Sequence, residues 1–500
     1  MSLEETRKDL RSQTKVVCVV APAGCGKTFE ACKYALEVAE SLATGEQVLF
    51  LAHTNAAVQE FRIRTRKLAP RVDASTIDAF CLELLLPYAA RLGLPTPLQH
   101  RLGREEGCVP FEDLARFVGE LLKRSPSIAN LYAGRYPVII LDEHQDASEH
   151  QHGAIQLIGC ARRVRLRIFG DPMQAIFEDD ERARVSWNAV ESCAEIRAEL
   201  DFPQRWKDVL ELGNWILELR KRLKSGQGIP PLHQGLPITF HPIDIEDPGF
   251  KPTIDRQVVS LLHKLLNSLS GSTAVLGWLK NHVYKLQVAS NGRLILNEGA
   301  EFDDAYAAVE RLQKAIGKPM PLAKSVVKVL AGDKCGFTSI RMERISNALG
   351  RDRITDPRSV ELKALIDQLR PIYDTPDLAT ACKVIREISR TPPAWLAIRT
   401  PECFSILGRV RPNPGDDPKE LLRQLIIQHK LLARRRTQIA STIHKSKGLE
   451  FDHVVLTNFG AKHFCGSEQS RRLAYVALSR ARRSIHIVIP TRTPSPLLSG

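Results

Sequence analysis

The chain has 500 residues, and its Lys and Arg outnumber its Asp and Glu by 71 to 57, which gives a net charge of +14. This length exceeds one hydrophobic core, so we expect at least two domains, and the positive charge favours a polyanionic partner. The eleven cysteines lack C-x-x-C spacing, and no apolar run reaches the length of a membrane span. We therefore expect no disulfide framework, no zinc or iron–sulfur site and no membrane protein, but a cytoplasmic one.

The first predicted elements are an apolar strand, a glycine turn and a helix from about Thr28 to Leu42. The turn at residues 21–28 reads APAGCGKT, which is typical of a phosphate-binding loop, although Ala21 occupies the usual first glycine position. Glycines let backbone N–H groups face phosphates, lysine reaches the terminal phosphate and threonine ligates Mg²⁺. The expected nucleotide-binding residues of this loop are Ala23, Gly24, Cys25, Gly26, Lys27 and Thr28.

Strand and helix patterns alternate beyond this loop. Strands are predicted at 47–52, 138–141 and 166–169, with a helix at 56–67 and a small helical insertion at about 87–134. This alternation is typical of a mostly parallel sheet covered by helices. Ligands of such open sheets bind at the carboxyl ends of the strands, so we expect the chemistry there.

Two acids follow the apolar strand at 138–141. Asp142 is expected to hold Mg²⁺, together with Thr28, and Glu143 to polarise the attacking water as general base. An exposed acidic pair at a strand end is a common alternative, but a phosphate loop in the same sheet favours nucleotide hydrolysis.

A second α/β pattern starts after Leu200, with a long helical interruption. Strands are predicted at 237–241, 273–276, 438–441, 453–457 and 484–489, and helices at 255–269, 304–316, 360–369, 378–388 and from Asp417 onward. The expected domains are a first α/β domain (1–86 and 135–199) with its insertion (87–134), and a second (200–289 and 434–500) with its insertion (290–433).

Residues 142–146, DEHQD, resemble the D-E-x-Q-D box of superfamily 1 DNA helicases of the UvrD/Rep/PcrA type. Other boxes follow in family order, at residues 51–55, 75–80, 170–177, 201–205, 442–451 and 473–481. The resemblance implies two RecA-like P-loop motor domains with parallel sheets, each carrying a helical insertion. It also implies ATP and Mg²⁺ as cofactors and single-stranded DNA or a tailed duplex as the partner.

The resemblance implies a role for individual residues. Gln174 would sense the γ-phosphate, and Arg205 and Arg480 would stabilise its charge in the manner of arginine fingers. Gly448 and Glu450 would contribute to nucleotide binding, the latter at the ribose. The residues expected to contact DNA are Thr54, Asn55, Thr76, Phe80, Phe177 and His444. Phe80 and Phe177 would stack on bases, with core packing as the alternative for both.

The chain departs from the family at several positions. Gln204 stands where the family has a tyrosine that stacks on adenine, which leaves the base of the nucleotide open between ATP and other triphosphates. Asp78 replaces a usual histidine of the second DNA box. We expect a compact form without a nuclease domain. It acts mainly as a translocase or depends on a protein partner, such as a nuclease, for unwinding, and the pathway stays open between DNA repair and defence.

Three functions fit these observations. The first is an ATP-dependent DNA helicase or translocase that moves 3′→5′, with the polarity implied by the resemblance. The second is a nucleic-acid-stimulated NTPase that senses DNA or RNA ends with a partner and does not unwind processively. The third is an RNA helicase of the same superfamily.

Overall fold

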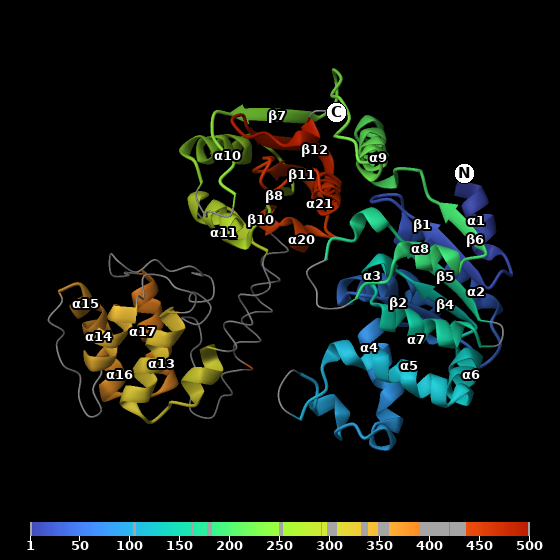
Figure 1. Cartoon of the computed structure of the whole chain (residues 1–500), viewed down its shortest axis with the longest axis horizontal. Helices are drawn as coiled ribbons and strands as arrows, with labels where there is room; N and C mark the ends of the chain where they lie inside the picture. The colour runs from blue at the N-terminus through green and yellow to red at the C-terminus, as the bar shows by residue number, and fades with distance from the viewer. Residues whose placement is uncertain are drawn as a thin grey trace. The chain divides into compact units, whose positions relative to one another are not determined.

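The chain forms two compact units. Figure 1 labels their helices and strands. In this computed structural model the first unit comprises Met1–Asp247, Lys447–Val454 and Phe459–Gly500, and the second comprises Pro248–Ser446 and Val455–Asn458. The residues that the structure describes are 3–103, 107–161, 164–177, 183–249, 254–291, 293–297, 308–331, 339–348, 360–390, 420 and 437–498.

A six-stranded parallel sheet is the centre of the first unit. Its order is β3-β2-β4-β5-β1-β6. The strands are β1 (Val16–Val20), β2 (Val48–Ala52), β3 (Val72–Thr76), β4 (Val138–Leu141), β5 (Arg165–Gly170) and β6 (Ile196–Glu199). The predicted strands β1, β2, β4 and β5 are confirmed. β1, β2 and β4 are apolar runs, and β5 is buried along most of its length although it contains Arg165 and Arg167. β5 lies between β1 and β4 in the sheet. The phosphate loop, which follows β1, and the two acids, which follow β4, are therefore separated by one strand.

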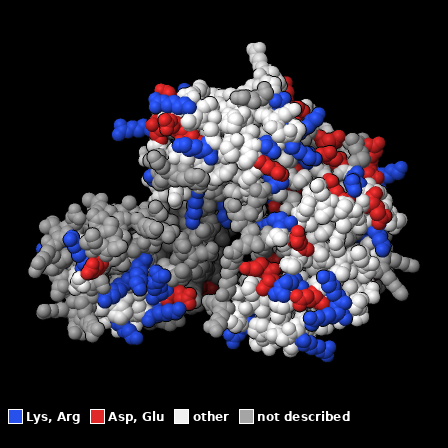
Figure 2. Space-filling model, in the orientation of Figure 1, with Lys and Arg blue, Asp and Glu red and all other residues white. Residues whose placement is uncertain are grey.

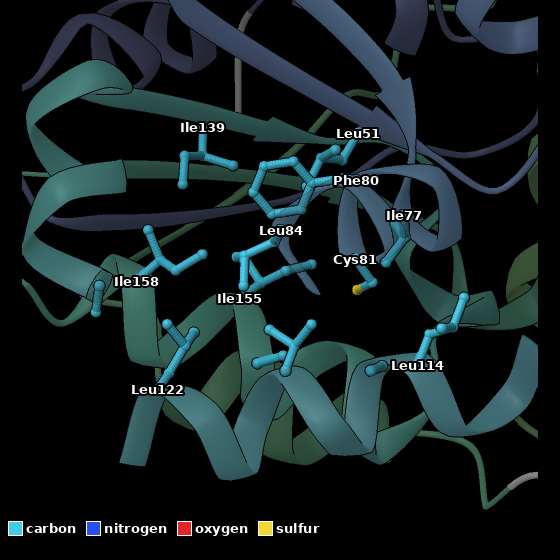
Figure 3. Close-up of a cluster of buried hydrophobic side chains, with 14 of the residues drawn as sticks. Leu51, Ile77, Phe80, Cys81, Leu84, Leu114, Leu122, Ile139, Ile155 and Ile158 are labelled. Atoms are coloured by element: carbon cyan, nitrogen blue, oxygen red, sulfur yellow. The ribbon is translucent and has the colours of Figure 1, made fainter. Parts of the chain in front are cut away.

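Alternate residues of these strands pack into two cores, one on each face of the sheet. Val17 and Phe50 pack with α2 (Lys27–Ser41) and α3 (Asn55–Thr65). Leu51 and Ile139 pack on the opposite face with α4 (Ile77–Leu85), α5 (Leu114–Arg124), α6 (Pro126–Arg135) and α7 (Glu149–Gly159), as Figure 3 shows in part. The region between α4 and β4 is helical and contributes its apolar faces to this second core.

A buried arginine holds the segment that precedes β1 and the phosphate loop. Arg167 on β5 is fully buried and donates to the carbonyl oxygens of Leu10, Ser12 and Thr14 at 2.8, 2.6 and 3.0 Å. These carbonyls belong to the end of α1 (Leu3–Arg11) and to the turn that leads into β1. Burial lowers the pKa of Arg167, and the carbonyl dipoles compensate the charge.

A second sheet of six strands has the order β7-β12-β11-β8-β10-β9. Its strands are β7 (Ile238–Ile243), β8 (Thr273–Gly277), β9 (Ile295–Leu296), β10 (Gln438–Thr442), β11 (Phe451–Leu456) and β12 (Ala481–Pro490). β12 pairs with β7, and β10 pairs with β8 and β9, all in parallel. Helices of this region are α9 (Leu210–Lys224), α10 (Arg256–Ser268), α11 (Lys280–Ala289), the short α20 (Ile443–Ser446) and α21 (Glu468–Leu478). The fold is therefore two mostly parallel α/β arrangements, as expected.

The second unit also contains a helical body with a core of its own. Its helices are α13 (Pro319–Ala331), α14 (Ser339–Ala348), α15 (Val360–Leu369), α16 (Pro371–Asp374) and α17 (Leu378–Arg390), and their apolar faces share one cluster. The predicted helices at 360–369 and 378–388 are confirmed. The helix expected from Asp417 lies outside the described residues, as do residues 304–307 of another. Within the described ranges, no helix has the length and apolarity that crossing a membrane requires.

Candidate active site

The phosphate loop between β1 and α2 has the backbone that its glycines predict. Gly24 and Gly26 have φ angles of 74° and 82°, a left-handed conformation that glycine adopts without steric cost. Gly26 precedes the first turn of α2, so the loop ends at a helix N-terminus. Ala21 continues β1, is fully buried, and donates its N–H to Gly170 O at 2.8 Å. Its φ is not positive, which explains why alanine is compatible with this position.

Lys27 lies against the two acids that follow β4. Its Nζ forms an ion pair with Glu143 Oε1 and lies 3.4 Å from Asp142 Oδ1. Burial opposes the charge of Lys27, but the carboxylates outweigh it and raise the pKa of Lys27. Burial likewise opposes ionisation of Glu143, yet Lys27 and Lys447 lower the pKa of Glu143. Both groups are therefore charged at neutral pH.

Thr28 and Asp142 provide oxygen atoms that suit Mg²⁺. Thr28 Oγ1 donates to Asp142 Oδ2 at 3.3 Å, so the hydroxyl and the carboxylate face one another. Burial raises the pKa of Asp142, against the attraction of Lys27. Among the described residues no group of three or more His, Cys, Asp or Glu is arranged to hold a metal ion. Two oxygen ligands fit Mg²⁺, which proteins commonly hold through one or two side chains together with nucleotide phosphates.

Glu143 has an unusual backbone. Its φ is 53°, a left-handed conformation that is uncommon for a residue with a side chain. Its carboxylate accepts a hydrogen bond from Gln145 Nε2, and its N–H donates to Asp142 Oδ1 at 2.9 Å. These contacts, together with the Lys27 ion pair, fix the direction of the carboxylate toward the phosphate loop. Such local strain is common where a side chain has a functional position.

Asp171, at the end of β5, is the centre of a buried hydrogen-bond network. The carboxylate is fully buried and accepts from Arg220 Nε and Gln174 Nε2, both at 3.0 Å, and from the Tyr475 hydroxyl at 3.2 Å. The Tyr475 hydroxyl in turn accepts from Ala23 N at 2.8 Å. α21 therefore contacts the phosphate loop through the Tyr475 hydroxyl. Asp171 lies at the carboxyl end of a predicted strand, where we expected the chemistry. Tyr475 had not been predicted as a site residue, although it belongs to a recognised box.

Arg205 and Arg480 also lie at this site, within the first unit. Arg205 N donates to Gly24 O at 2.9 Å, and its guanidinium donates to Ser479 O at 2.5 Å and Glu450 Oε1 at 2.7 Å. The Arg480 guanidinium is 3.4 Å from Gln174 Oε1. Burial and the neighbouring Arg205 lower the pKa of Arg480 to about 10.

Three further predicted nucleotide-binding residues have different environments. Glu450 accepts from both Arg205 and Arg482, and these arginines lower the pKa of its carboxyl against the effect of burial. Gly448 is exposed and has a φ of 80°. Cys25 is buried, and burial raises the pKa of its thiol to about 12, so the thiol is un-ionised and packs as an apolar residue.

The residues expected to contact nucleic acid have unequal exposure. Thr54 and Thr76 cap α3 and α4 and accept from the backbone N–H groups of Ala57 and Ala79, both at 3.2 Å. Asn55 is exposed, and His444, in α20 of the second unit, is half-buried. Phe177 is 39% exposed and therefore accessible to a base.

Phe80 is a core residue. It is 4% exposed, and its ring contacts Tyr132 edge-to-face with centroids 5.8 Å apart. Figure 3 shows this ring inside the apolar cluster, beside Leu51 and Leu84. A base could stack on it only if this core opened, so burial favours the packing alternative over base stacking. The departure at Asp78 also has a local explanation, because its carboxylate accepts from Gln151 Nε2 at 2.7 Å.

Lys447 connects the nucleotide site with Phe177. Its Nζ lies 2.6 and 2.8 Å from the carboxylate oxygens of Asp146 and donates to Gln174 O at 2.5 Å. The same ammonium lies 5.1 Å from the centroid of the Phe177 ring, within the range of a cation–π interaction. Lys447 had not been predicted as a site residue, and its place in the box at 442–451 was the available signal.

Two buried histidines, His144 and His152, lie beside the acids that follow β4. His144 Nε2 and His152 Nδ1 are 2.8 Å apart, and His144 is fully buried directly after Glu143. Burial lowers the pKa of both rings, most strongly that of His144, where the neighbouring His152 adds to the effect. Both rings are therefore neutral at pH 7 in the folded chain.

This pair predicts a loss of stability on mild acidification. Below a pH of about 6.5 the unfolded chain protonates both rings, whereas burial disfavours their protonation in the folded chain, so the free energy of unfolding falls as the pH falls. We expect this loss to develop as the pH falls from about 6.5 to about 5. The double variant His144→Gln/His152→Gln should show a flatter melting-temperature profile over this window. The exposed His150 on the same helix provides the control, and its replacement by glutamine should leave the profile unchanged.

Basic side chains also gather on the helical body of the second unit. Figure 2 shows lysine and arginine side chains over α13. This helix and the segment before it contribute Lys314, Lys318, Lys324 and Lys328, and α13 itself has no acidic residue. An exposed basic surface of this kind suits a phosphate backbone.

Comparisons with known proteins give two family matches. An AAA domain model matches residues 6–179, which include the phosphate loop and the acids Asp142 and Glu143. A UvrD-like helicase C-terminal domain model matches residues 439–488, which include Glu450, Tyr475 and Arg480. No curated protein matches the chain.

Proposed function

We propose that this chain is an ATP-driven motor that moves 3′→5′ on single-stranded DNA. The two matched families identify it as a UvrD-like superfamily 1 helicase. The observation that carries the proposal is the phosphate loop with Lys27 against Asp142 and Glu143, next to the guanidinium groups of Arg205 and Arg480. Phosphoryl transfer requires this combination of positioning and positive charge. We assign the motors to residues 1–86 with 135–199, and to 200–289 with 434–500, each with its helical insertion.

The chain's residues would divide the hydrolytic work as follows. Lys27 would exchange the carboxylates for phosphate oxygens, and Thr28 and Asp142 would hold Mg²⁺. Glu143 accepts the proton of the attacking water, and Arg205 and Arg480 neutralise charge that develops on the phosphoryl group. Gln174, bonded to both Asp171 and Arg480, is placed to respond to that group. ATP and Mg²⁺, when bound, supply the transferable phosphoryl group and the counter-charge.

Strand binding would act on this site through Lys447. Thr54, Asn55, Thr76 and His444 are proposed contacts to the strand, and Phe177 is the proposed stacking residue. A base on Phe177 changes the surroundings of the Lys447 ammonium, which also holds Asp146 and the carbonyl of Gln174. This contact set supports nucleic-acid-stimulated hydrolysis, in which stacking contributes about 1–3 kcal/mol per base.

The site assignment is tested with Lys27→Ala. This variant is expected to lose ATP turnover, because alanine removes the ammonium that would contact the phosphate oxygens, and to retain binding of single-stranded DNA. Turnover is measured by phosphate release and strand binding by fluorescence anisotropy. Turnover at the wild-type rate would refute the assignment of the active site.

The motor activity is tested by strand separation on 3′-tailed and 5′-tailed duplexes. Separation of only the 3′-tailed DNA is the expected result. Hydrolysis stimulated by single strands without any separation would support the end-sensing NTPase instead. Matched RNA substrates distinguish an RNA helicase, and GTP in place of ATP tests the base preference that Gln204 leaves open.

A further inference from the structure

Trp206 is in direct contact with the phosphate loop. It ends the 3₁₀ turn η8 (Gln204–Trp206), directly after Arg205, and is the largest of the fully buried side chains among the described residues. Its indole faces Gly24 so closely that a Cβ on this glycine would lie 2.6 Å from the ring atom Cζ3. The loop can therefore shift toward η8 only if the indole moves with it.

The opposite edge of the same indole contacts the segment that carries Arg480. Trp206 Nε1 donates to Ala481 O at 2.7 Å, and Ala481 directly follows Arg480 at the start of β12. On the other side, the Arg205 guanidinium lies 5.3 Å from the indole centroid. One rigid ring thus touches the phosphate loop and lies next to both arginines.

Simple core packing does not account for the hydrogen bond. Trp215 on α9 is also buried, at 5% exposure, and its Nε1 has no hydrogen-bond partner within the part of the chain that the structure describes. The fold therefore buries one indole without a polar contact, while the indole at Gly24 has a short one. α9 packs closely against Trp206: a Cβ on Gly213 of this helix would lie 2.8 Å from Trp206 Cβ.

We propose that Trp206 is a positioning residue that fixes the distance between the phosphate loop and the two arginines, so that both guanidiniums reach the transferred phosphoryl group. The proposal rests on the proposed ATPase function. The indole has two rotatable bonds and is closely packed, so a displacement of Gly24 passes to Ala481 and to the backbone of Arg480. A misplacement of about 1 Å at such a site can cost about 100-fold in rate.

The test compares Trp206→Phe with Trp215→Phe in the full-length chain. Phenylalanine fills much of the indole volume but has no N–H for Ala481 O. Trp206→Phe is expected to lower the kcat of strand-stimulated ATP hydrolysis by about 10- to 100-fold, with KM within about threefold. Trp215→Phe should leave both constants near the wild-type values. If Trp206→Phe does not fold, Trp206→Tyr, which keeps more bulk and also lacks the indole N–H, is expected to show the same loss.

A second measurement tests the contact between Trp206 and the phosphate loop without ATP hydrolysis. Addition of a non-hydrolysable ATP analogue should change tryptophan emission in the wild type and in Trp215→Phe, and the change should be lost in Trp206→Phe or Trp206→Tyr. Wild-type kcat in the Trp206 variants, or an equal fall in Trp215→Phe, would overturn the positioning role. A wild-type chain that hydrolyses no nucleotide would refute the proposed function, and the emission measurement would still decide the role of Trp206.

Discussion

Replacement of Glu143 by glutamine is expected to lower the kcat of ATP hydrolysis by about 10²- to 10⁴-fold and to leave nucleotide binding intact. Glutamine keeps the size of the side chain but cannot accept the proton of the attacking water. Asp142 still lies 3.4 Å from Lys27 Nζ and still faces Thr28, so the phosphate loop keeps its partners. Because one negative charge disappears beside the bound phosphates, the affinity for nucleotide should stay constant or rise.

The rate and the affinity of Glu143→Gln are measured separately. Single-turnover hydrolysis gives the rate of the chemical step, and titration with a fluorescent nucleotide gives the dissociation constant. Glu149→Gln is the matched control, since Glu149 is an exposed acid at the start of α7. Wild-type turnover in Glu143→Gln would show that another group activates the water.

Replacement of Arg205 by lysine is expected to lower kcat by about 10³-fold or more, the range of an arginine finger. The Arg205 guanidinium donates at once to Ser479 O and to Glu450 Oε1, while its backbone N–H holds Gly24 O. A lysine ammonium is a single point of charge on a flexible stem and cannot reproduce this planar, two-sided contact. The loss should appear in kcat more than in KM, because the charge matters most in the transition state.

Arg482 offers a matched control for this prediction. It pairs with the same carboxylate, Glu450, at 2.6 Å, but its side chain is 52% exposed. Arg482→Lys should therefore change the kcat of strand-stimulated hydrolysis by less than about threefold, since exposed ion pairs contribute little. Equal losses in both variants would indicate that the pairing of Glu450, rather than Arg205 itself, supports hydrolysis.

The strands that sequence predicted differ in composition from those it missed. β1, β2 and β4 are continuous apolar runs, and such runs are typical of strands buried between two layers of helices. β3 reads VDAST and has one buried residue, and β6 reads IRAE, so neither has a local apolar signal. β3 and β6 form because they pair with neighbouring strands. A segment of four or five residues does not by itself indicate that pairing.

The two phenylalanines predicted to stack on bases also show what sequence alone does not determine. Phe80 and Phe177 both occupy recognised boxes, and sequence left core packing and base stacking open for each. The structure buries Phe80 among Leu51, Leu84 and the tyrosines of α6 and its C-terminal end, and leaves Phe177 39% exposed. Exposure depends on how α4 and α6 pack on the sheet, which is a property of distant segments.

Sequence by itself determined the chemistry of the loop at 21–28, the acids after β4 and the family, because glycine conformation and the order of the boxes are local properties of the chain. Tertiary structure alone decided the partners: Tyr475 with Ala23, Lys447 with Asp146, and Trp206 with Gly24. The residues of the first two pairs are hundreds of positions apart. Short-range sequence patterns specify helices and strands. Only the packing of those helices and strands brings the residues of these pairs into contact.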